Sequence, residues 1–214
     1  MEVPMRLFLS SYKIGNAPEE LRRLASRGKI GYVANALDFS NADRERRAQH
    51  IKADIESLER LGLQVQQIDL RAYFGNKDAL KDKLDELSAI FVSGGNVFVL
   101  RQAMRLSGLD NILEDLRGSD DFLYAGYSAA GCVLAPSLSS YEIVDPPETP
   151  YKELTEVLWD GLALVDFAFM PHWDSDHPES SSIEREIAYC RQHDIPYKAV
   201  RDGEVIVMKT EPRC

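Results

Sequence analysis

The sequence has few cysteines and no long apolar segment. Its three cysteines, Cys132, Cys190 and Cys214, are too few and too widely spaced for a disulfide framework or a zinc knuckle, and free thiols suit a reducing compartment. No apolar run approaches the length of a membrane span, and residues 1–6 lack the basic region and apolar segment of a secretory signal. We therefore expect a cytoplasmic protein that does not insert into a membrane.

Basic residues are scarce relative to acidic ones. Lysine and arginine total 25 against 35 aspartates and glutamates, which gives a formal net charge of -10. Such a chain is repelled by a phosphate backbone and by an anionic membrane surface, so neither nucleic acid nor a membrane is expected as a partner. Its 214 residues, 44% of them hydrophobic, suit one domain spanning residues 1–214, as a monomer or a homodimer.

Strands and helices are predicted to alternate along the chain. The strands are continuous apolar runs, which is typical of parallel strands covered on both faces, and helices with one apolar stripe separate them. We therefore predict an α/β three-layer sandwich with a mainly parallel, doubly wound sheet. The predicted strands are 6–10, 29–34, 63–68, 89–92, 122–125, 162–165 and 167–170, with a terminal hairpin of 197–200 and 205–208. The predicted helices are 18–27, 43–61, 78–87, 109–116 and 179–193, and two more begin at 97 and 129.

One predicted strand turns into a helix at a serine. Gly126 and Tyr127 end the strand, Ser128 follows, and Ala129 and Ala130 open the helix. Small residues suit a nucleophile on a tight, strained turn, because larger side chains would clash there. The first backbone N–H groups of the helix can hold a developing oxyanion. The same pattern is also typical of a simple packing turn.

Small and polar residues stand where the predicted parallel strands end. Ligands bind beyond the carboxyl ends of strands in open parallel sheets, so these residues are expected to gather in one site. The amides of Gly94 and Gly95 can share the oxyanion with Ala129, because glycine lets the backbone approach a substrate closely. The strand ends are Ser10-Ser11, Asn35, Gly94-Gly95-Asn96, Ser128 and Pro171-His172.

A serine nucleophile needs a base, and histidine has a suitable pKa near neutrality. The chain has four histidines. His50 lies on the charged side of a long predicted helix, and His193 lies in the last turn of another. His177 remains possible, but His172 directly follows an apolar strand and a proline and is therefore the preferred base.

The segment His172-Trp173-Asp174-Ser175-Asp176-His177 permits a second interpretation. Alternating histidine and aspartate can hold a divalent metal, although no motif such as His-Glu-x-x-His is present. Asp174 and Asp176 can instead cap the following helix or, with His177, bind substrate. We predict no metal and no cofactor.

Four segments, taken in order, resemble the dipeptidase E and cyanophycinase family of serine peptidases. They are Ser93-Gly94-Gly95-Asn96-Val97-Phe98, Gly126-Tyr127-Ser128-Ala129, Ile143-Val144-Asp145-Pro146, and Pro171-His172 followed by Pro178-Glu179. The resemblance implies a flavodoxin-like fold related to class I glutamine amidotransferases. It further implies Ser128 as nucleophile, His172 as base and Asp202 as the acid of a triad, with Asn96 beside the oxyanion and substrate.

The chain departs from the family pattern at three points. The usual elbow has glycine two residues after the serine, where this chain has Ala130. Dipeptidase E reads an amino-terminal aspartate with an arginine on the helix after the histidine, and here Arg185 lies near that position between two glutamates, so aspartyl specificity is not expected. An acid near the elbow has also been assigned to the triad in this family, and Glu142 is the alternative here.

Three functions follow from these observations. The leading hypothesis is a serine peptidase that hydrolyses short peptides through an acyl-enzyme. The first alternative is a non-catalytic homologue that uses the cleft to bind a small ligand or a partner, and the Ala130 departure motivates it. The second is a metal-dependent hydrolase that uses the cluster of His172, Asp174, Asp176 and His177.

Overall fold

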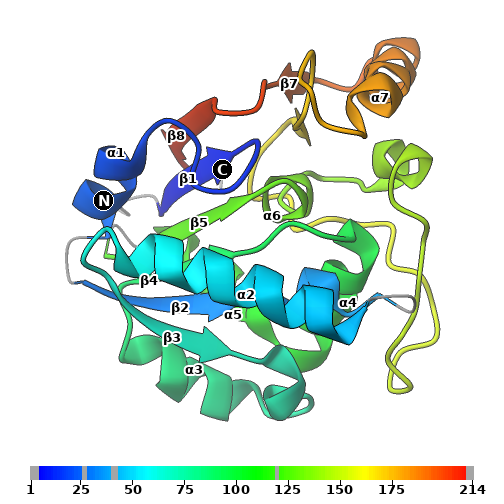
Figure 1. Ribbon diagram of the computed structural model, residues 1–214. Coiled ribbons are helices and arrows are strands. Elements are labelled where there is room, and N and C mark those ends of the chain that lie inside the picture. Colours follow the sequence, from blue (N-terminus) through cyan, green and yellow to red (C-terminus); the bar gives the residue numbers. More distant parts are fainter. Residues whose placement is uncertain (1–4, 26–27, 40–42, 119–120, 211–214) are drawn as a thin grey trace.

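A six-stranded sheet forms the centre of the described structure. The computed structural model describes residues 5–25, 28–39, 43–118 and 121–210 (Figure 1). The strand order is β3-β2-β4-β5-β1-β8, and β8 runs antiparallel to β1 whereas the other neighbours are parallel. The strands are β1 (Arg6–Ser10), β2 (Lys29–Val33), β3 (Gln64–Ile68), β4 (Ala89–Val92), β5 (Leu123–Tyr127) and β8 (Val205–Lys209).

The central strands are buried on both faces. Every residue of β4 and β5 is buried, whereas β3 at the edge of the sheet is largely exposed. This burial explains the continuous apolar runs of the inner strands. The α/β three-layer sandwich with a mainly parallel sheet is confirmed, and the predicted strands from 6–10 to 122–125 differ from the observed ones only at their ends.

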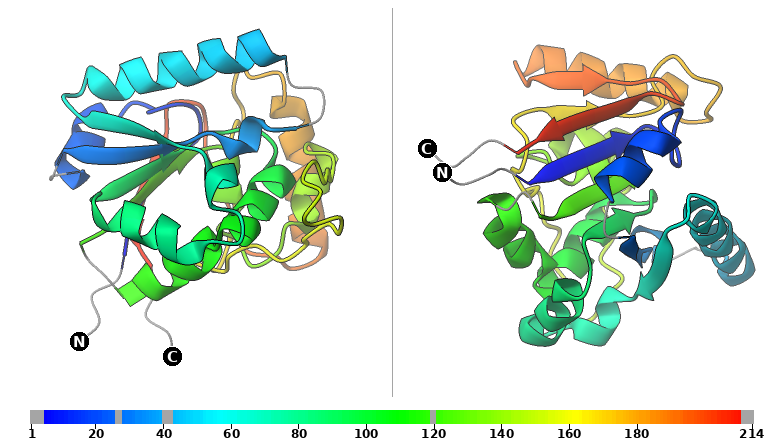
Figure 2. Two further views of the ribbon diagram at one scale, coloured as in Figure 1. Left: turned by 90° about the horizontal axis from the view of Figure 1, so that it is seen from below. Right: turned by 90° about the vertical axis from the view of Figure 1, so that its left-hand side faces the viewer.

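Helices cover both faces of the sheet (Figure 2). On one face, α1 (Pro18–Leu24) and α2 (Arg44–Glu59) pack against apolar side chains of the sheet, and on the other face α3 (Lys77–Asp85), α4 (Val97–Ser107) and α5 (Leu109–Asp115) do the same. The end of the predicted helix 18–27 falls on residues 26–27, outside the described residues. None of the described helices is long and apolar enough to cross a membrane. Single 3-10 turns are η1 (Asn35–Leu37), η2 (Leu70–Tyr73), η3 (Leu116–Gly118) and η4 (Ser139–Ile143).

Two further helices and a small second sheet complete the described structure. The helix predicted from 129 is one turn, α6 (Ala129–Cys132), whereas α7 (Ser180–Gln192) is long and buries Ile183, Ile187 and Cys190. The small sheet consists of β6 (Ala168–Met170) and β7 (Tyr197–Ala199), which pair in parallel. Figure 1 shows α7 at the end of the molecule next to β7.

The predicted terminal hairpin and the strand at 162–165 are wrong. Residues 197–200 and 205–208 lie in different sheets, because β7 pairs with β6 and β8 pairs with the open edge of β1. The backbone N–H groups of Leu162 and Leu164 bond to the carbonyls of Val133 and Leu134 in an irregular connection. The turn 201–204 therefore leads from the small sheet to the central sheet, and Asp202 lies on it.

Candidate active site

Ser128 stands at the end of β5 in a strained backbone conformation. Its φ of 51 and ψ of -115 are rare for a residue with a side chain. A Cβ atom added to Gly126 would lie 2.5 Å from both the carbonyl oxygen of Val92 and the Cβ atom of Ala130. The absence of a side chain at Gly126 therefore leaves room for the methyl group of Ala130. The turn at Ser128 forms with alanine at position 130, where the family pattern has glycine.

Gly94 and Gly95 face the elbow at the end of the neighbouring strand. A Cβ atom on Gly94 would lie 3.1 Å from the Cβ atom of Ser128 and closer still to the ring of Tyr127. Gly95 has a φ of 138, which glycine adopts without strain. Asn96 then caps α4, because its side-chain oxygen accepts hydrogen bonds from the backbone N–H groups of Phe98 (2.9 Å) and Val99 (3.0 Å).

His172 is buried and its ring is held by a carboxylate. The Nδ1 atom of His172 lies 2.7 Å from Oδ1 of Asp202. The hydroxyl of Ser11 donates to the same carboxylate oxygen at 2.8 Å and accepts from the backbone N–H of His172 at 2.8 Å. The backbone N–H of Asp202 donates to the hydroxyl of Ser175 at 2.7 Å. A proton on Nδ1, shared with Asp202, leaves Nε2 of His172 free to act as a base.

Burial lowers the pKa of His172 below its usual value of 6.5. Desolvation is the largest cause and the nearby His177 adds to it, whereas Asp202 acts in the opposite direction. The imidazole is therefore neutral at neutral pH, which is the protonation state that a general base requires.

We expect the acid limb of the pH profile to lie below pH 6.5. As the pH falls through the pKa of His172, the ring gains a proton and the base is lost, so a lowered pKa moves the loss of activity to lower pH. Measuring kcat/KM against pH reports this group in the free enzyme. A half-maximal acid limb at pH 7 or above would contradict the assignment.

Ser128 and His172 line one cavity of about 400 Å³. Gly94, Gly95 and Asn96 line the same cavity, so the predicted strand-end residues at 94–96, 128 and 172 come together. Tyr12 also lines it, and the ring centroid of Tyr12 lies 6.0 Å from that of His172. The remaining lining residues are Phe39, His50, Tyr127, Asp145, Pro146, Glu148, His177 and Glu179.

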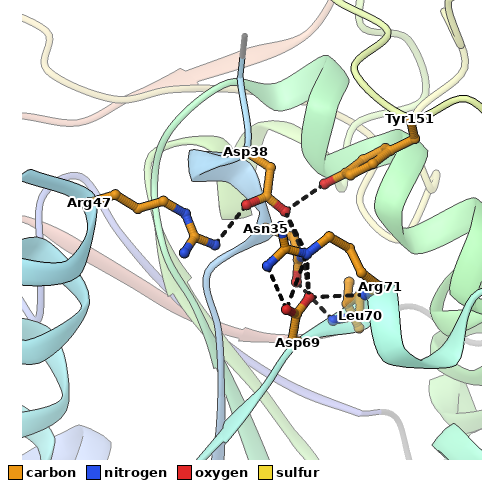
Figure 3. A network of polar contacts seen from close by, with 7 residues as sticks. All are labelled: Asn35, Asp38, Arg47, Asp69, Leu70, Arg71 and Tyr151. Carbon is orange, nitrogen blue, oxygen red and sulfur yellow. Dashed lines mark hydrogen bonds and ion pairs between the residues drawn. The ribbon is translucent and has the colours of Figure 1, made fainter. Parts of the chain in front are cut away.

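Asn35, another predicted strand end, does not line this cavity and lies in a separate polar network (Figure 3). Its side chain donates to Asp38 and Asp69 and accepts from the backbone N–H of Leu70. Tyr151 joins the same network by donating to Asp38 at 2.8 Å. The network therefore anchors the segment that follows Asp145 and Glu148 to the end of β2.

A buried carboxylate that bonds to Tyr127, the residue before Ser128, was not predicted from the sequence. Asp54 is 4% exposed and accepts from Lys13 Nζ (2.6 Å) and from the hydroxyls of Tyr32 and Tyr127 (2.8 Å each). Burial raises its pKa, but hydrogen bonds from His50 and Lys13 outweigh this, so the pKa lies below its usual value. The available signal was the position of Asp54 on the apolar stripe of α2, three residues after Ile51.

Most of the other predicted site residues do not line the cavity. His177 lines the cavity and its ring stacks on His172, with centroids 3.7 Å apart. Asp174 is exposed and pairs with Arg201, and Asp176 and Arg185 are exposed and do not line the cavity. Glu142 is exposed on η4, whereas Asp202 contacts the imidazole.

The alternative metal cluster of His172, Asp174, Asp176 and His177 is not the group of possible ligands that comes together in the described residues. Among the described residues, the group whose ligand atoms come within 4.8 Å of one another is His172, His177 and Glu179. The two imidazole planes are inclined by only 12°. The lone pairs of imidazole nitrogens lie in the ring plane. In two stacked rings these lone pairs run parallel and do not converge on one point. A tetrahedral metal bound by both histidines would therefore require one ring to turn.

The chain belongs to peptidase family S51. The family model matches residues 31–212, which agrees with the resemblance seen in the sequence. An uncharacterized peptidase of Listeria innocua is 32% identical over 127 residues, which cover 59% of this chain and 57% of that protein. Peptidase E of Streptomyces coelicolor is 32% identical over 145 residues, 64% of this chain and 54% of the relative. The matched region thus spans little more than half of these relatives.

Two solved structures share the fold. A peptidase E protein from Listeria monocytogenes matches with a TM-score of 0.74 and 21% identity, over 98% of this chain and all of that one. A peptidase from an acI-B1 Actinobacterium matches with a TM-score of 0.67 and 14% identity, over 98% of this chain and 85% of its own. These similarities extend the shared architecture across nearly the whole chain.

Proposed function

We propose that the protein is a serine peptidase that hydrolyses short peptides through an acyl-enzyme. The observation that carries the proposal is the cavity lined by Ser128 and by His172, whose imidazole is in turn bound by Asp202. Membership in peptidase family S51 supports it, and so does the name of a Drosophila melanogaster relative, a probable alpha-aspartyl dipeptidase, 28% identical over 60% of this chain. A cavity of about 400 Å³ suits a short peptide rather than a folded protein.

In the proposed reaction, Ser128 is the nucleophile and His172 acts first as a base and then as an acid. The Oγ atom of Ser128 attacks the peptide carbonyl and its proton passes to Nε2 of His172. The backbone N–H groups of Gly95 and Ala129 receive the negative charge on the carbonyl oxygen. His172 then returns the proton to the leaving amine as the peptide bond breaks. A water molecule then attacks the acyl-enzyme and gives a proton to Nε2 of His172. The ester bond breaks, the carboxylic acid product leaves, and the proton returns to Oγ of Ser128.

Asp202 keeps the imidazole in the required tautomer and stabilises the imidazolium that forms. Ser11 orients Asp202 and His172 together, because its hydroxyl bonds to both. The proposal involves no cofactor or metal, and a cytoplasmic location stays a prediction.

Labelling with a fluorophosphonate tests the proposal directly. We expect one covalent adduct per chain, at Ser128, because only an activated serine reacts quickly. Peptide mapping by mass spectrometry identifies the residue, and His172→Ala should abolish the adduct. A folded protein that gives no adduct at Ser128 would support the alternative, a non-catalytic homologue that binds a ligand in the same cavity.

A further inference from the structure

One buried carboxylate connects the two halves of the proposed active site. Asp54, on α2, is buried and does not line the catalytic cavity. Its Oδ2 atom accepts a hydrogen bond from the hydroxyl of Tyr127 at 2.8 Å, and its Oδ1 atom accepts one from Nζ of Lys13 at 2.6 Å. Tyr127 ends β5, whereas Lys13 belongs to the turn after β1. Asp54 therefore joins two segments that lie 114 residues apart in sequence.

The bond to Tyr127 holds the segment that carries the nucleophile. Tyr127 directly precedes Ser128, and its ring fills the space beside Gly94, where an added Cβ atom would lie 2.8 Å from the ring. The same Cβ atom would lie 3.1 Å from that of Ser128. Burial raises the pKa of Tyr127, so the hydroxyl keeps the proton that it donates to Asp54. Fixing this hydroxyl therefore fixes the ring between the elbow and the oxyanion glycines.

The bond to Lys13 holds the segment that orients the base. Ser11 lies two residues before Lys13, and its hydroxyl bonds to Asp202 and to the backbone N–H of His172. Lys13 has a φ of 52, which is rare for a residue with a side chain. Such a backbone conformation persists only where the surroundings impose it. The ion pair with Asp54 supplies this constraint, because it is the shortest of the side-chain contacts that Lys13 makes.

Further contacts close the network around Asp54. Nε2 of His50 lies 2.6 Å from the hydroxyl of Tyr127 and 2.9 Å from Nζ of Lys13. The hydroxyl of Tyr32, in β2, donates to Oδ2 of Asp54 at 2.8 Å. Burial raises the pKa of Asp54, but hydrogen bonds from His50 and Lys13 outweigh it, so the carboxylate is charged at neutral pH. Hydrogen bonds to a charged acceptor are strong, and they restrain every group that they join.

Proton transfer in the proposed reaction depends on the spacing between Ser128 and His172. The two residues come from separate segments, one after β5 and one after β6. A misplacement of about 1 Å caused by a change far from the chemistry can lower a rate by about 100-fold. A group that is bonded to both segments is therefore in a position to control the rate.

We propose that Asp54 is a positioning residue that fixes the spacing between the nucleophile and the base. It acts on Ser128 through Tyr127. It acts on His172 through Lys13 and Ser11. This inference rests on the proposed peptidase function and names a further residue on which that reaction depends. Because Asp54 lies outside the cavity, its loss should affect turnover more than substrate binding.

Asp54→Asn tests the proposal, because it removes the charge and keeps the shape of the side chain. We expect kcat for a dipeptide to fall by about 100-fold and KM to change by less than about threefold. Lys13→Met and Tyr127→Phe each remove one of the two bonds and should lower kcat by about tenfold. Lys13 is 30% exposed, so Lys13→Met carries the test if Asp54→Asn does not fold. An unchanged kcat in folded Asp54→Asn protein overturns the proposal.

Asp110→Asn is the matched control. Asp110 forms a second buried ion pair, with Arg101 at 3.1 Å, and neither side chain lines the catalytic cavity. Breaking either buried pair destabilises the fold, so thermal unfolding should occur at a lower temperature in both variants. We expect kcat to fall in Asp54→Asn alone. An equal fall in Asp110→Asn would trace the effect to lost stability and overturn the proposal.

Nuclear magnetic resonance of the imidazole separates this inference from the proposed function. The proton between Nδ1 of His172 and Asp202 is observed without any turnover. We expect it to exchange with water about tenfold faster in Asp54→Asn and Lys13→Met, and at the wild-type rate in Asp110→Asn. That result supports the inference even if the wild-type protein hydrolyses nothing. Unchanged exchange in both Asp54→Asn and Lys13→Met overturns it even if hydrolysis occurs.

Discussion

Replacing Ser128 with alanine is expected to lower kcat by about 10⁴-fold to 10⁶-fold, because nucleophile and base act as one unit. The substitution removes only the hydroxyl, so the strained turn and the cavity remain. The measurement is hydrolysis of a dipeptide at saturating concentration, with folding checked by circular dichroism. Retained turnover in a folded Ser128→Ala protein would exclude the acyl-enzyme.

His172→Ala provides the companion measurement to Ser128→Ala. If the two residues act together, the double variant should be about as slow as either single variant, since removing the second partner costs little once the first is gone. Multiplicative losses would instead show that the serine and the imidazole act independently.

Asp202→Asn is expected to lower kcat by about 10⁴-fold while leaving the fold intact. The asparagine side chain matches the carboxylate in size, but its amide can donate a hydrogen bond to Nδ1 of His172. That donor stabilises the tautomer in which Nε2 carries the proton, so the ring can no longer accept one from Ser128. The measurement is kcat at saturating substrate across a range of pH values.

Glu142→Gln is the matched control for Asp202→Asn. Glu142 is the alternative acid suggested by the family pattern, and it is exposed on η4. We expect full activity in this variant. A large loss in Glu142→Gln together with normal activity in Asp202→Asn would transfer the acid to position 142.

Much of the central sheet could be predicted from the sequence because its signals are local. Apolar runs ended by glycine or polar residues marked β1, β2 and β4, and buried parallel strands leave this trace in a sequence. The gathering of Gly94, Ser128 and His172 followed from a general rule about the carboxyl ends of parallel strands.

The pairing of the last strands depended on distant parts of the chain. Residues 197–208 have the local pattern of a hairpin, but the open edges of β1 and β6 compete for the same backbone groups. Likewise, the role of Ser11 depends on His172 and Asp202, which lie 161 and 191 residues away in sequence. Local reading of a sequence cannot weigh partners at that separation.

The burial of Glu186 was not predicted for a similar reason. Glu186 sits in a charged stretch that reads as a solvated helix face, and its burial arises only when α7 packs against η4. Its neighbour Arg185 attracted attention in the sequence because of its charge. One step along a helix turns a side chain by about 100°, which is enough to exchange an exposed position for a buried one.

Residues 201–204 cross from the small sheet to the central sheet, so the position of Asp202 depends on the pairing of both β7 and β8. A chain in which β8 has not yet docked beside β1 already has its serine and its imidazole, but the carboxylate that orients the ring still lacks a fixed position. The proposed orientation of the imidazole by Asp202 therefore requires β8 to be docked on the edge of the central sheet, which links the proposed chemistry to completion of the fold.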